Sequence, residues 1–480
     1  MNLLNLDHFS PVLAAALSRG GQYADIFAED TTVTSIELQD GKVSQAQQAV
    51  LYGAGIRVIH DGQTGYAYTM DLSPEALLRA ARFAGSISGS ASLGSDFAGS
   101  QKPAAAPDKF YWTAQETEKT RLPHNLDPPP AKSTAVPSHQ VRQLLLRLDE
   151  EARQSDPRII RVKAALTQRI QRIQFANSRG EAYTDQRPRT ALVVRIVMEQ
   201  NGETQMGMST RMMQMGADFV TEERIHSVIA EAVSRAAFLF DAVQPQGGEM
   251  PVVMAAGGSG ILLHEAIGHA FEADFIRQGT SIFTGQLGRQ ICSPEITIVD
   301  DGTQPGDAGM LRWDDEGVPG QRTTLVREGR LESFLYDRIS AEHFHVKPTG
   351  NGRRESFRYV PQPRMRSTYM LAGQATEEDI IRSVRRGIYA QVFTNGQVQI
   401  GAGDFTFYMK QGYLIEDGRL TRPIRDVNII GNGPQALRDI SMVADNLLID
   451  HSASMCGKGG QSVPVSQGLP TVLINKLIVG

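Results

Sequence analysis

Two histidines and a glutamate lie within six residues of one another, at His264, Glu265 and His269. Imidazole nitrogens and carboxylates are side chains from which proteins build hydrolytic metal sites, and zinc is the usual metal of such sites. In the familiar zinc-protease signature the two histidines are four residues apart on one helical face, with a glutamate between them as the base. The segment therefore predicts a zinc centre that hydrolyses its substrate.

The spacing departs from that signature, because His264 and His269 are five residues apart. Five residues of a regular α-helix turn the chain so far that the two rings point about 140° apart, and they would not face one ion. One additional residue in a turn, a π-bulge, would bring both rings to one face, and Gly268 gives the backbone the freedom to form it. We therefore expect an irregular helix over Ala266 to His269, after a glycine-rich entry at 257–260.

Two histidines do not complete a catalytic zinc site, which usually has three protein ligands and one open position. The chain has 10 His and 2 Cys, so candidates for the third ligand are few. Cys456 lies in a loop of small residues that could bring a thiolate to a metal, and Cys292 is the weaker candidate. Glu272 and Asp274 are alternatives, either as ligands or as acceptors for the imidazole N–H groups.

The pattern of expected strands and helices that must position these side chains indicates a mixed α+β chain with two domains. Residues 1–243 are expected to form an N-terminal α/β domain with two strand-helix rounds. Strands in 51–68 and 191–212, each folded around an Asp-Gly or Asn-Gly turn, precede helices over 73–84 and 221–240. This repetition indicates an internal duplication. Residues 101–138, rich in proline and polar residues, are predicted to form a flexible insertion.

We expect the domain boundary at residues 244–248, because glycine and proline occur there between a predicted helix and a predicted strand. Residues 249–480 are expected to form a mostly antiparallel, barrel-like or sandwich β domain that carries the metal helix. Tight turns are expected at Glu328-Gly329 and Asp417-Gly418. The predicted strands cover residues 251–255, 296–299, 323–327, 331–335, 397–400, 405–409 and 413–416.

Five segments of the chain, taken in order, resemble the TldD branch of the TldD/PmbA family. They are LHEAIGH at 263–269, VDDGT at 299–303, DDEG at 314–317, TGNGRRES at 349–356 and CGKGGQ at 456–461. The match is strongest from about Gly257 onward. The resemblance implies a zinc metallopeptidase whose metal ligands are His264, His269 and Cys456, with Glu265 as general base.

The same resemblance implies a similar two-domain α+β fold that dimerises, either with a PmbA (TldE)-like partner chain or with itself, so that assembly encloses the site. The PmbA branch lacks the metal motif, so this chain resembles the active partner. The expected reaction is the hydrolysis of peptide bonds in peptides or unfolded protein segments by metal-activated water. The alternative is a non-catalytic regulatory or binding protein that modulates DNA gyrase, a label that some members of the family carry.

Arginines at positions 353, 354, 358, 364 and 366 could suggest nucleic-acid binding. The chain as a whole is acidic, with 48 Lys and Arg against 53 Asp and Glu and a formal net charge of -5. This balance argues against nucleic acid as a partner and favours structural or substrate-binding roles for the arginines.

Membrane and secretory features are absent from the sequence pattern. No stretch approaches the roughly 20 apolar residues of a membrane span. Met1 to Gly20 lacks the basic start and apolar core of a secretory leader, and two cysteines far apart do not make a disulfide framework. We therefore expect a soluble, cytoplasmic protein.

Overall fold

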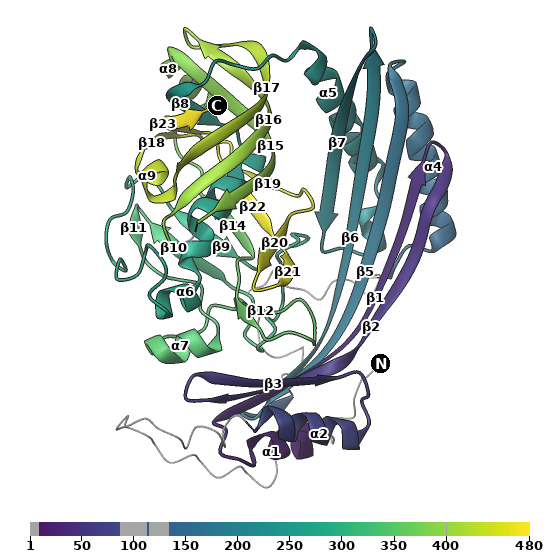
Figure 1. Cartoon of the computed structure of the whole chain (residues 1–480), viewed down its shortest axis with the longest axis vertical. Helices are drawn as coiled ribbons and strands as arrows, with labels where there is room; N and C mark the ends of the chain where they lie inside the picture. Colours follow the sequence, from purple (N-terminus) through teal and green to yellow (C-terminus); the bar gives the residue numbers. More distant parts are fainter. Residues whose placement is uncertain (1–8, 87–112, 115–133, 400) are drawn as a thin grey trace.

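The computed structural model describes residues 9–86, 113–114, 134–399 and 401–480, and it is a mixed α+β structure (Figure 1). A long curved sheet from the first half of the chain lies beside a more compact body of sheets and short helices from the second half. Most of the insertion expected at 101–138 lies outside the described residues. In the part of the chain that the structure describes, no helix combines the length and the hydrophobicity needed to cross a bilayer.

One seven-stranded sheet contains all strands of the first half, in the order β3-β2-β1-β5-β6, with β4 and β7 both paired to β6. Tight turns join its hairpins, since Asp40-Gly41, Asp61-Gly62 and Asn201-Gly202 all have positive φ, as two-residue hairpin turns require. The Asp61-Gly62 and Asn201-Gly202 turns confirm the predicted ones. The strands are β1 (Tyr23–Gln39), β2 (Lys42–His60), β3 (Gln63–Thr69), β4 (Thr113–Ala114), β5 (Ile159–Asn177), β6 (Glu181–Gln200) and β7 (Glu203–Met213).

The first half of the chain repeats the same order of elements twice: a helix, three strands of the sheet and a second helix. α1 (Phe9–Leu17) and α2 (Pro74–Ala84) flank β1 to β3, and α4 (Ser138–Ser155) and α5 (Glu222–Asp241) flank β5 to β7. A short 3-10 helix, η2 (Ala217–Phe219), precedes α5. Side-chain caps fix the starts of α2 and α5, where Ser73 accepts from the Ala76 N–H and Thr221 from the Arg224 N–H. Each helix pair covers its own apolar core.

The second half contains a sheet that closes into a ring. Its order is β17-β16-β15-β8-β23-β18, and an additional pairing of β17 with β23 closes it. Only the β15–β8 pairing is parallel among the pairings described for this sheet, so it is mostly antiparallel, as expected. The strands are β8 (Gly248–Met254), β15 (Arg386–Val398), β16 (Asp404–Glu416), β17 (Arg419–Asn432), β18 (Ile440–Val443) and β23 (Val472–Val479).

A second six-stranded sheet, in the order β11-β10-β9-β14-β22-β19, and two short hairpins complete the strands. They are β9 (Ile298–Asp301), β10 (Arg322–Arg327), β11 (Arg330–Leu331), β14 (Ser367–Met370), β19 (Leu448–Asp450) and β22 (Ser466–Leu469), with hairpins β12 (Gly352–Arg353)–β13 (Gln362–Pro363) and β20 (Met455–Lys458)–β21 (Gln461–Pro464). The helices are η3 (Gly258–Gly260), η4 (Leu262–Gly268), η5 (His269–Phe271), α6 (Ala273–Arg277), α7 (Arg338–Phe344), α8 (Glu377–Ser383) and α9 (Gly433–Arg438).

Several predicted strand boundaries are wrong. The strands expected at 405–409 and 413–416 form one strand, β16, because its backbone pairs with β15 on one side and with β17 on the other through residues 409–412. The strand expected at 397–400 overlaps the last two residues of β15, which runs from Arg386 to Val398, and residue 400 lies outside the described residues. The strand expected at 331–335 ends at Leu331. Polar residues and glycines suggested that these strands end early. Pairing with a neighbouring strand on each edge keeps the backbone extended through them.

Candidate metal centre

The two histidines lie at opposite ends of a distorted helical segment. Residues Leu262–Gly268 form the π-helix η4, which continues directly into the 3-10 helix η5 at His269. The wider turn of a π-helix compensates for the five-residue spacing and brings the centroids of the two rings to 5.0 Å from each other. The predicted irregular helix is therefore confirmed. A Cβ at Gly268 would overlap the Sδ of Met365, so this position also needs glycine for space.

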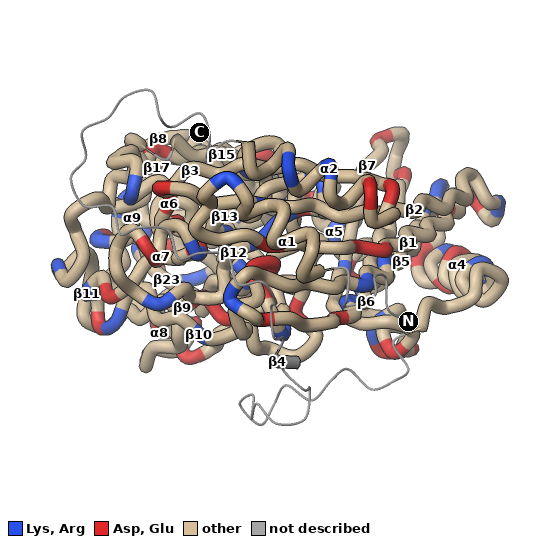
Figure 2. Tube along the Cα trace, turned by 90° about the horizontal axis from the view of Figure 1, so that it is seen from below, with Lys and Arg blue, Asp and Glu red and all other residues tan. Residues whose placement is uncertain are grey.

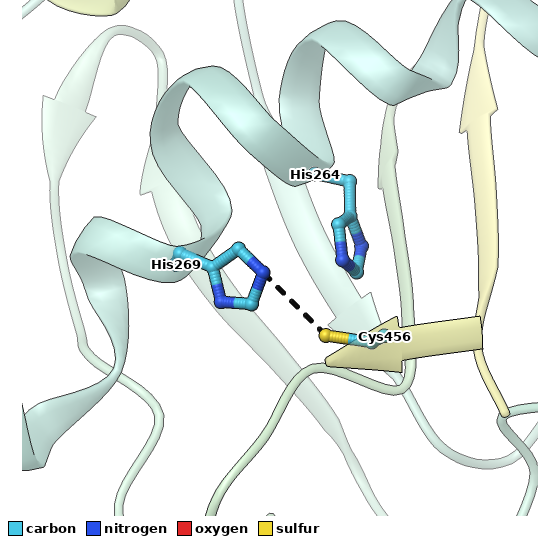
Figure 3. Close-up of side chains that lie close together, drawn as sticks. All are labelled: His264, His269 and Cys456. Atoms are coloured by element: carbon cyan, nitrogen blue, oxygen red, sulfur yellow. Dashed lines mark hydrogen bonds between the residues drawn. The ribbon is translucent and has the colours of Figure 1, made fainter. Parts of the chain in front are cut away.

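Cys456 reaches the histidines from the hairpin β20–β21, which turns at Gly459 and Gly460, both with positive φ. The Sγ atom of Cys456 lies 3.5 Å from Nε2 of His269. One potential ligand atom from each of His264, His269 and Cys456 lies within 4.8 Å of the others, and all three residues are buried. Figure 3 shows both rings and the sulfur directed toward one common point.

These three side chains fit a divalent metal ion. The ligand atoms around one tetrahedral zinc, with its usual nitrogen and sulfur distances, lie roughly 3.3 to 3.6 Å apart, and the 3.5 Å between the Cys456 sulfur and Nε2 of His269 falls in this range. The Nδ1 atom of His264 is buried and lacks a hydrogen-bond partner within the described residues, which is costly in a protein interior unless another group binds the ring. Three protein donors leave a fourth position open, as hydrolytic sites require.

The electrostatics of the three side chains favour a thiolate at Cys456. Burial alone would raise the pKa of this thiol, but the adjacent imidazoles of His264 and His269 hold its pKa well below the ordinary value. Burial likewise opposes a charge on His269, yet the carboxylate of Glu272 and the sulfur of Cys456 hold the pKa of His269 well above the ordinary value. A thiolate is the form of cysteine that binds metals.

The other predicted ligand candidates have different places. Glu272 Oε2 lies 3.2 Å from Nδ1 of His269, on the ring edge away from Cys456, so it acts as an acceptor for the imidazole. Asp274 pairs with Lys458 at 2.8 Å. Cys292 is absent from the metal-ligand cluster, and burial raises the pKa of its thiol to about 12.

Lys458 links these outer carboxylates to the Cys456 hairpin. Its Nζ lies 2.9 Å from Glu272 and 2.8 Å from Asp274, and it belongs to the same strand as Cys456. Burial opposes the charge of Glu272, but Lys458 and His269 hold its pKa down at about 2. Glu272 is therefore a permanent anion that fixes both the His269 ring and the strand that carries Cys456.

Glu265, the predicted general base, is not held by another described side chain. It is half-buried, follows His264 directly, and has no hydrogen bond or ion pair with any other described residue. A carboxylate without a fixed partner at the edge of a buried site can accept and release a proton.

The arginine-rich segment has a structural role. Arg353, Arg354, Arg364 and Arg366 are buried, and only Arg358 among the five is exposed. Arg364 donates to the backbone carbonyl of Cys456, and Arg366 donates to four backbone carbonyls around it. Figure 2 shows basic and acidic residues interspersed along the trace, without an extended basic stretch.

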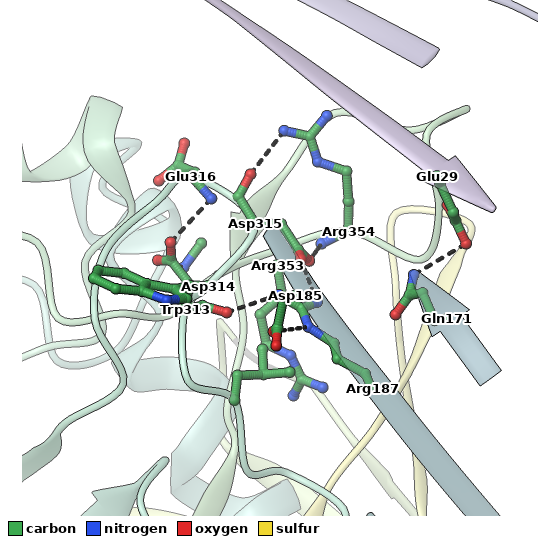
Figure 4. A network of polar contacts seen from close by, with 12 residues as sticks. Glu29, Gln171, Asp185, Arg187, Trp313, Asp314, Asp315, Glu316, Arg353 and Arg354 are labelled. Carbon is green, nitrogen blue, oxygen red and sulfur yellow. Dashed lines mark hydrogen bonds and ion pairs between the residues drawn. The ribbon is translucent and has the colours of Figure 1, made fainter. Parts of the chain in front are cut away.

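Sequence reasoning missed a buried ionic network close to this segment (Figure 4). Asp314, Asp315 and Glu316 are completely or almost completely buried. Asp315 pairs with Arg187 of β6 at 2.6 Å, and Glu316 pairs with Arg57 of β2 at 2.6 Å. The partners lie far apart in sequence, so no local signal could have identified them.

Models of three protein-family domains match the chain in order. They are described as PmbA/TldA metallopeptidase domain 1 at residues 24–88, central domain at 127–237 and C-terminal domain at 247–480. These matches cover most of the chain, including every element of the candidate metal centre.

Individual relatives agree with the family models. A metalloprotease TldD homolog of Haemophilus influenzae is 36% identical over 473 residues, covering 96% of this chain and 93% of the relative. A zinc metalloprotease TldD homolog of Saccharolobus solfataricus is 32% identical over 269 residues, covering 56% of this chain and 59% of the relative.

Solved structures share the fold. TldE from Thermococcus kodakarensis has a TM-score of 0.70 at 18% identity and covers 98% of this chain and 99% of its own. A structure from Thermotoga maritima, described as that of a proposed modulator of a DNA gyrase, has a TM-score of 0.71 at 20% identity over 98% of both chains. The resemblance noted in the sequence is thus confirmed, and the chain is a metallopeptidase that belongs to the PmbA/TldD family.

Proposed function

We propose that the protein is a zinc-dependent peptidase that hydrolyses peptide bonds in peptides or unfolded protein segments, with His264, His269 and Cys456 as metal ligands and Glu265 as general base. The observation that carries this proposal is the convergence of the three buried ligand atoms within 4.8 Å of one another. Two imidazoles and a thiolate favour zinc over harder ions such as magnesium and calcium. The relative in Saccharolobus solfataricus that is named a zinc metalloprotease supports the same metal.

A zinc ion at this site supplies Lewis acidity, which polarises the peptide carbonyl and makes water a usable nucleophile near neutral pH. Glu265 accepts the proton of the attacking water and passes it to the leaving amine. Glu272 orients His269 through its 3.2 Å contact with Nδ1, which leaves Nε2 directed toward Cys456. Lys458 holds Glu272 in place and keeps it ionised.

We also propose a division of the chain at residues 244–248, with a peptidase domain from 249 to 480 and an N-terminal domain from 1 to 243. The family model for the C-terminal domain, which begins at 247, supports this boundary. We further propose that the protein works as a dimer with a PmbA/TldE-like partner or with itself, and the structural similarity to TldE supports the first arrangement.

Metal analysis and peptide digestion test the proposed chemistry. We expect stoichiometric zinc in the purified protein and cleavage of unstructured peptides that stops on chelation. Glu265→Gln should keep the zinc and lose about 10²- to 10⁴-fold in kcat, because only the proton transfer is removed. Cys456→Ala should lose the zinc. Cys292→Ala is the matched control, since this buried cysteine lies outside the cluster, and it should keep both metal and activity.

The same experiment distinguishes the regulatory alternative that the Thermotoga maritima relative raises. Undiminished cleavage by Glu265→Gln would contradict the assigned base. A protein that contains no zinc and leaves peptides uncleaved, yet changes gyrase activity equally as wild type and as Cys456→Ala, would overturn the peptidase and favour a regulator.

A further inference from the structure

A small cavity lies next to the β20–β21 hairpin, because Ser462, Val463 and Pro464 of β21 are among the residues that line it. Its volume is about 40 Å³, and residues of β5, β6, β21 and the 353–355 segment line it. Five guanidinium groups belong to the lining, those of Arg169, Arg187, Arg189, Arg353 and Arg354, against the two carboxylates of Asp315 and Glu355. The lining therefore carries a local excess of positive charge.

Three of the five arginines have carboxylate partners of their own. Arg169 pairs with Glu29 at 3.1 Å, and Arg354 lies 3.6 Å from Asp25. Arg187 pairs with Asp185 and Asp315 at 3.0 and 2.6 Å. The remaining lining carboxylate, Glu355, accepts a hydrogen bond from the Ser462 backbone at 2.7 Å. None of the lining carboxylates forms an ion pair with the other two arginines.

Arg353 and Arg189 have no carboxylate partner among the described residues. Arg353 is buried and donates only to neutral backbone carbonyls, those of Met365 and Pro464, at 2.6 and 2.7 Å. Arg189 is half-buried in the cavity wall, and it makes neither a hydrogen bond nor an ion pair with any other described residue. Burial, together with the adjacent charges of Arg169 and Arg353, lowers the pKa of Arg189 to about 9. A cation that is partly or fully removed from water without an acidic partner is unfavourable, so these two arginines together favour an anion in the cavity.

The size of the cavity selects the class of anion. One water needs about 10 to 15 Å³ of such a volume, so about 40 Å³ holds an oxyanion group the size of a carboxylate or a phosphate. The planar guanidinium fork binds both groups with paired hydrogen bonds. We propose that the cavity is an oxyanion-binding site in which Arg189 and Arg353 bind one carboxylate or phosphate group.

An oxyanion at this place would tie the first half of the chain to the strand that supports the metal centre. Arg189 belongs to β6, whereas Arg353 holds the carbonyl of Pro464 in β21. In the hairpin, Val463 is the pairing partner of Cys456. The oxyanion would therefore steady the hairpin through Arg353 and the Pro464 carbonyl. This role does not depend on peptide hydrolysis, so it can be tested in protein without activity.

Calorimetric titration of the full-length protein with inorganic phosphate, and separately with acetate, tests the site. Sodium chloride at equal ionic strength corrects for screening. Wild type should bind phosphate with saturation, and Arg189→Gln should bind it at least tenfold more weakly. Arg195→Gln is the matched control, because Arg195 lies six residues further along β6, is exposed and does not line the cavity, so it should bind as wild type does.

Absence of binding by wild type, or equal binding by wild type and Arg189→Gln, would overturn the proposal. If Arg189→Gln does not fold, Arg189→Lys keeps the charge without the fork and should bind more weakly than wild type. Peptides with a free or an amidated C-terminus identify the source of the oxyanion. Tighter binding of the free acid, lost in Arg189→Gln, assigns the site to a peptide carboxylate, whereas equal binding of both peptides with saturable phosphate assigns it to a free anion.

Discussion

At the scale of single residues, the candidate metal centre depends on a chain of contacts that begins outside the three proposed ligands. Lys458 fixes Glu272, Glu272 fixes the ring of His269, and His269 directs its other nitrogen to Cys456. Each contact restricts the next side chain before a metal binds. Preorganisation of this kind is the usual reason that residues behind a metal site affect its affinity.

Glu272→Gln is expected to weaken zinc binding by about 10- to 100-fold, because a neutral amide holds the imidazole less firmly and leaves Lys458 without its anion. Competition with a chromophoric chelator measures this affinity. Asp274→Asn is the control, since Asp274 contacts Lys458 but not the histidine, and its effect should be several-fold smaller. Unchanged zinc affinity in Glu272→Gln would remove this residue from the site.

A second residue-scale consequence concerns pH. Burial, and then the nearby charge of Glu316, raises the pKa of Asp314 from 3.8 to about 7. The folded protein therefore binds this proton more tightly than the unfolded chain does. The stabilisation from this group is complete below about pH 4 and is lost as the pH rises toward 7.

Asp314→Asn cannot ionise, so we expect its unfolding midpoint to fall less than that of wild type between pH 4 and 7. The variant should also be less stable by about 1 to 3 kcal/mol, because an amide NH₂ would face the Gly352 N–H that Oδ2 now accepts. Thermal unfolding across this pH range measures both effects. Asp379→Asn is the control, because a hydrogen bond with Thr376 lowers the pKa of that exposed carboxyl. Its unfolding midpoint should therefore differ from that of wild type only near or below pH 4.

Spacing alone could indicate the candidate site residues that are close in sequence, whereas the distant Cys456 was selected as a ligand through the family resemblance. His264, Glu265 and His269 lie within one segment, so their spacing alone indicated a metal. Cys456 is 187 residues beyond His269, and composition only made it one of several candidates. The sequence did not indicate a role for Lys458, because a lysine beside glycines is common in loops. Its contacts with Glu272 and Asp274 form only in the folded chain.

At the scale of elements, the π-helix is the feature that makes the histidine spacing work. A regular helix over the same residues would direct the rings apart, whereas η4 brings their centroids to 5.0 Å. Gly268 permits this because the Met365 Sδ and the Leu263 carbonyl occupy the space where a Cβ would lie.

Gly268→Ala is expected to reduce the free energy of unfolding by about 1 to 3 kcal/mol, because the added methyl group must displace Met365 or the helix backbone. It should also lower the zinc content, since that displacement moves His269. Gly457→Ala is a closely matched control, because Gly457 follows the ligand Cys456 but has no neighbour within 4 Å of an added Cβ. Chemical unfolding and metal analysis compare the two, and equal behaviour would contradict the steric argument.

Elements were predictable where one residue type dictates one backbone conformation. Asp61-Gly62, Asn201-Gly202 and Asp417-Gly418 all adopt the positive φ that their types favour, so the hairpins around them were anticipated. The limits of β15, β16 and β17 were not, because pairing with neighbouring strands extends them through polar residues and glycine. The closure of the ring by β17 and β23 joins segments about fifty residues apart and leaves no local trace.

At the scale of the whole molecule, buried charges and aromatic rings join the long sheet to the compact body. Phe175 and Tyr183 of the sheet pack in one cluster with Trp313 and Phe357 of the second half. The Tyr183 hydroxyl donates to the Asp314 carbonyl at 2.8 Å. Arg57 bridges both halves, because it pairs with Asp25 of β1 and with Glu316. Both buried ion pairs and an aromatic cluster therefore hold the two halves in one orientation.

Arg57→Met is expected to destabilise the protein by about 3 to 5 kcal/mol, because it leaves the buried Glu316 carboxylate without its cation and leaves Asp25 with only Arg354 at 3.6 Å. Arg385→Met is the control, since Arg385 and its partner Asp417 are 94% and 88% exposed and their pair should contribute less than about 1 kcal/mol. Thermal unfolding at neutral pH, together with limited proteolysis of the folded protein, measures the difference.

Combining Arg57→Met with Glu316→Gln tests whether the loss comes from uncompensated charge or from lost packing. If charge is responsible, the double variant should be more stable than the sum of the two single changes predicts. Glu316→Gln removes one of the buried negative charges that Arg57→Met leaves uncompensated. If Arg57 acts mainly by filling space, the two effects should add. A loss below about 1 kcal/mol for Arg57→Met alone would show that the two halves are held together by the aromatic cluster rather than by these ions.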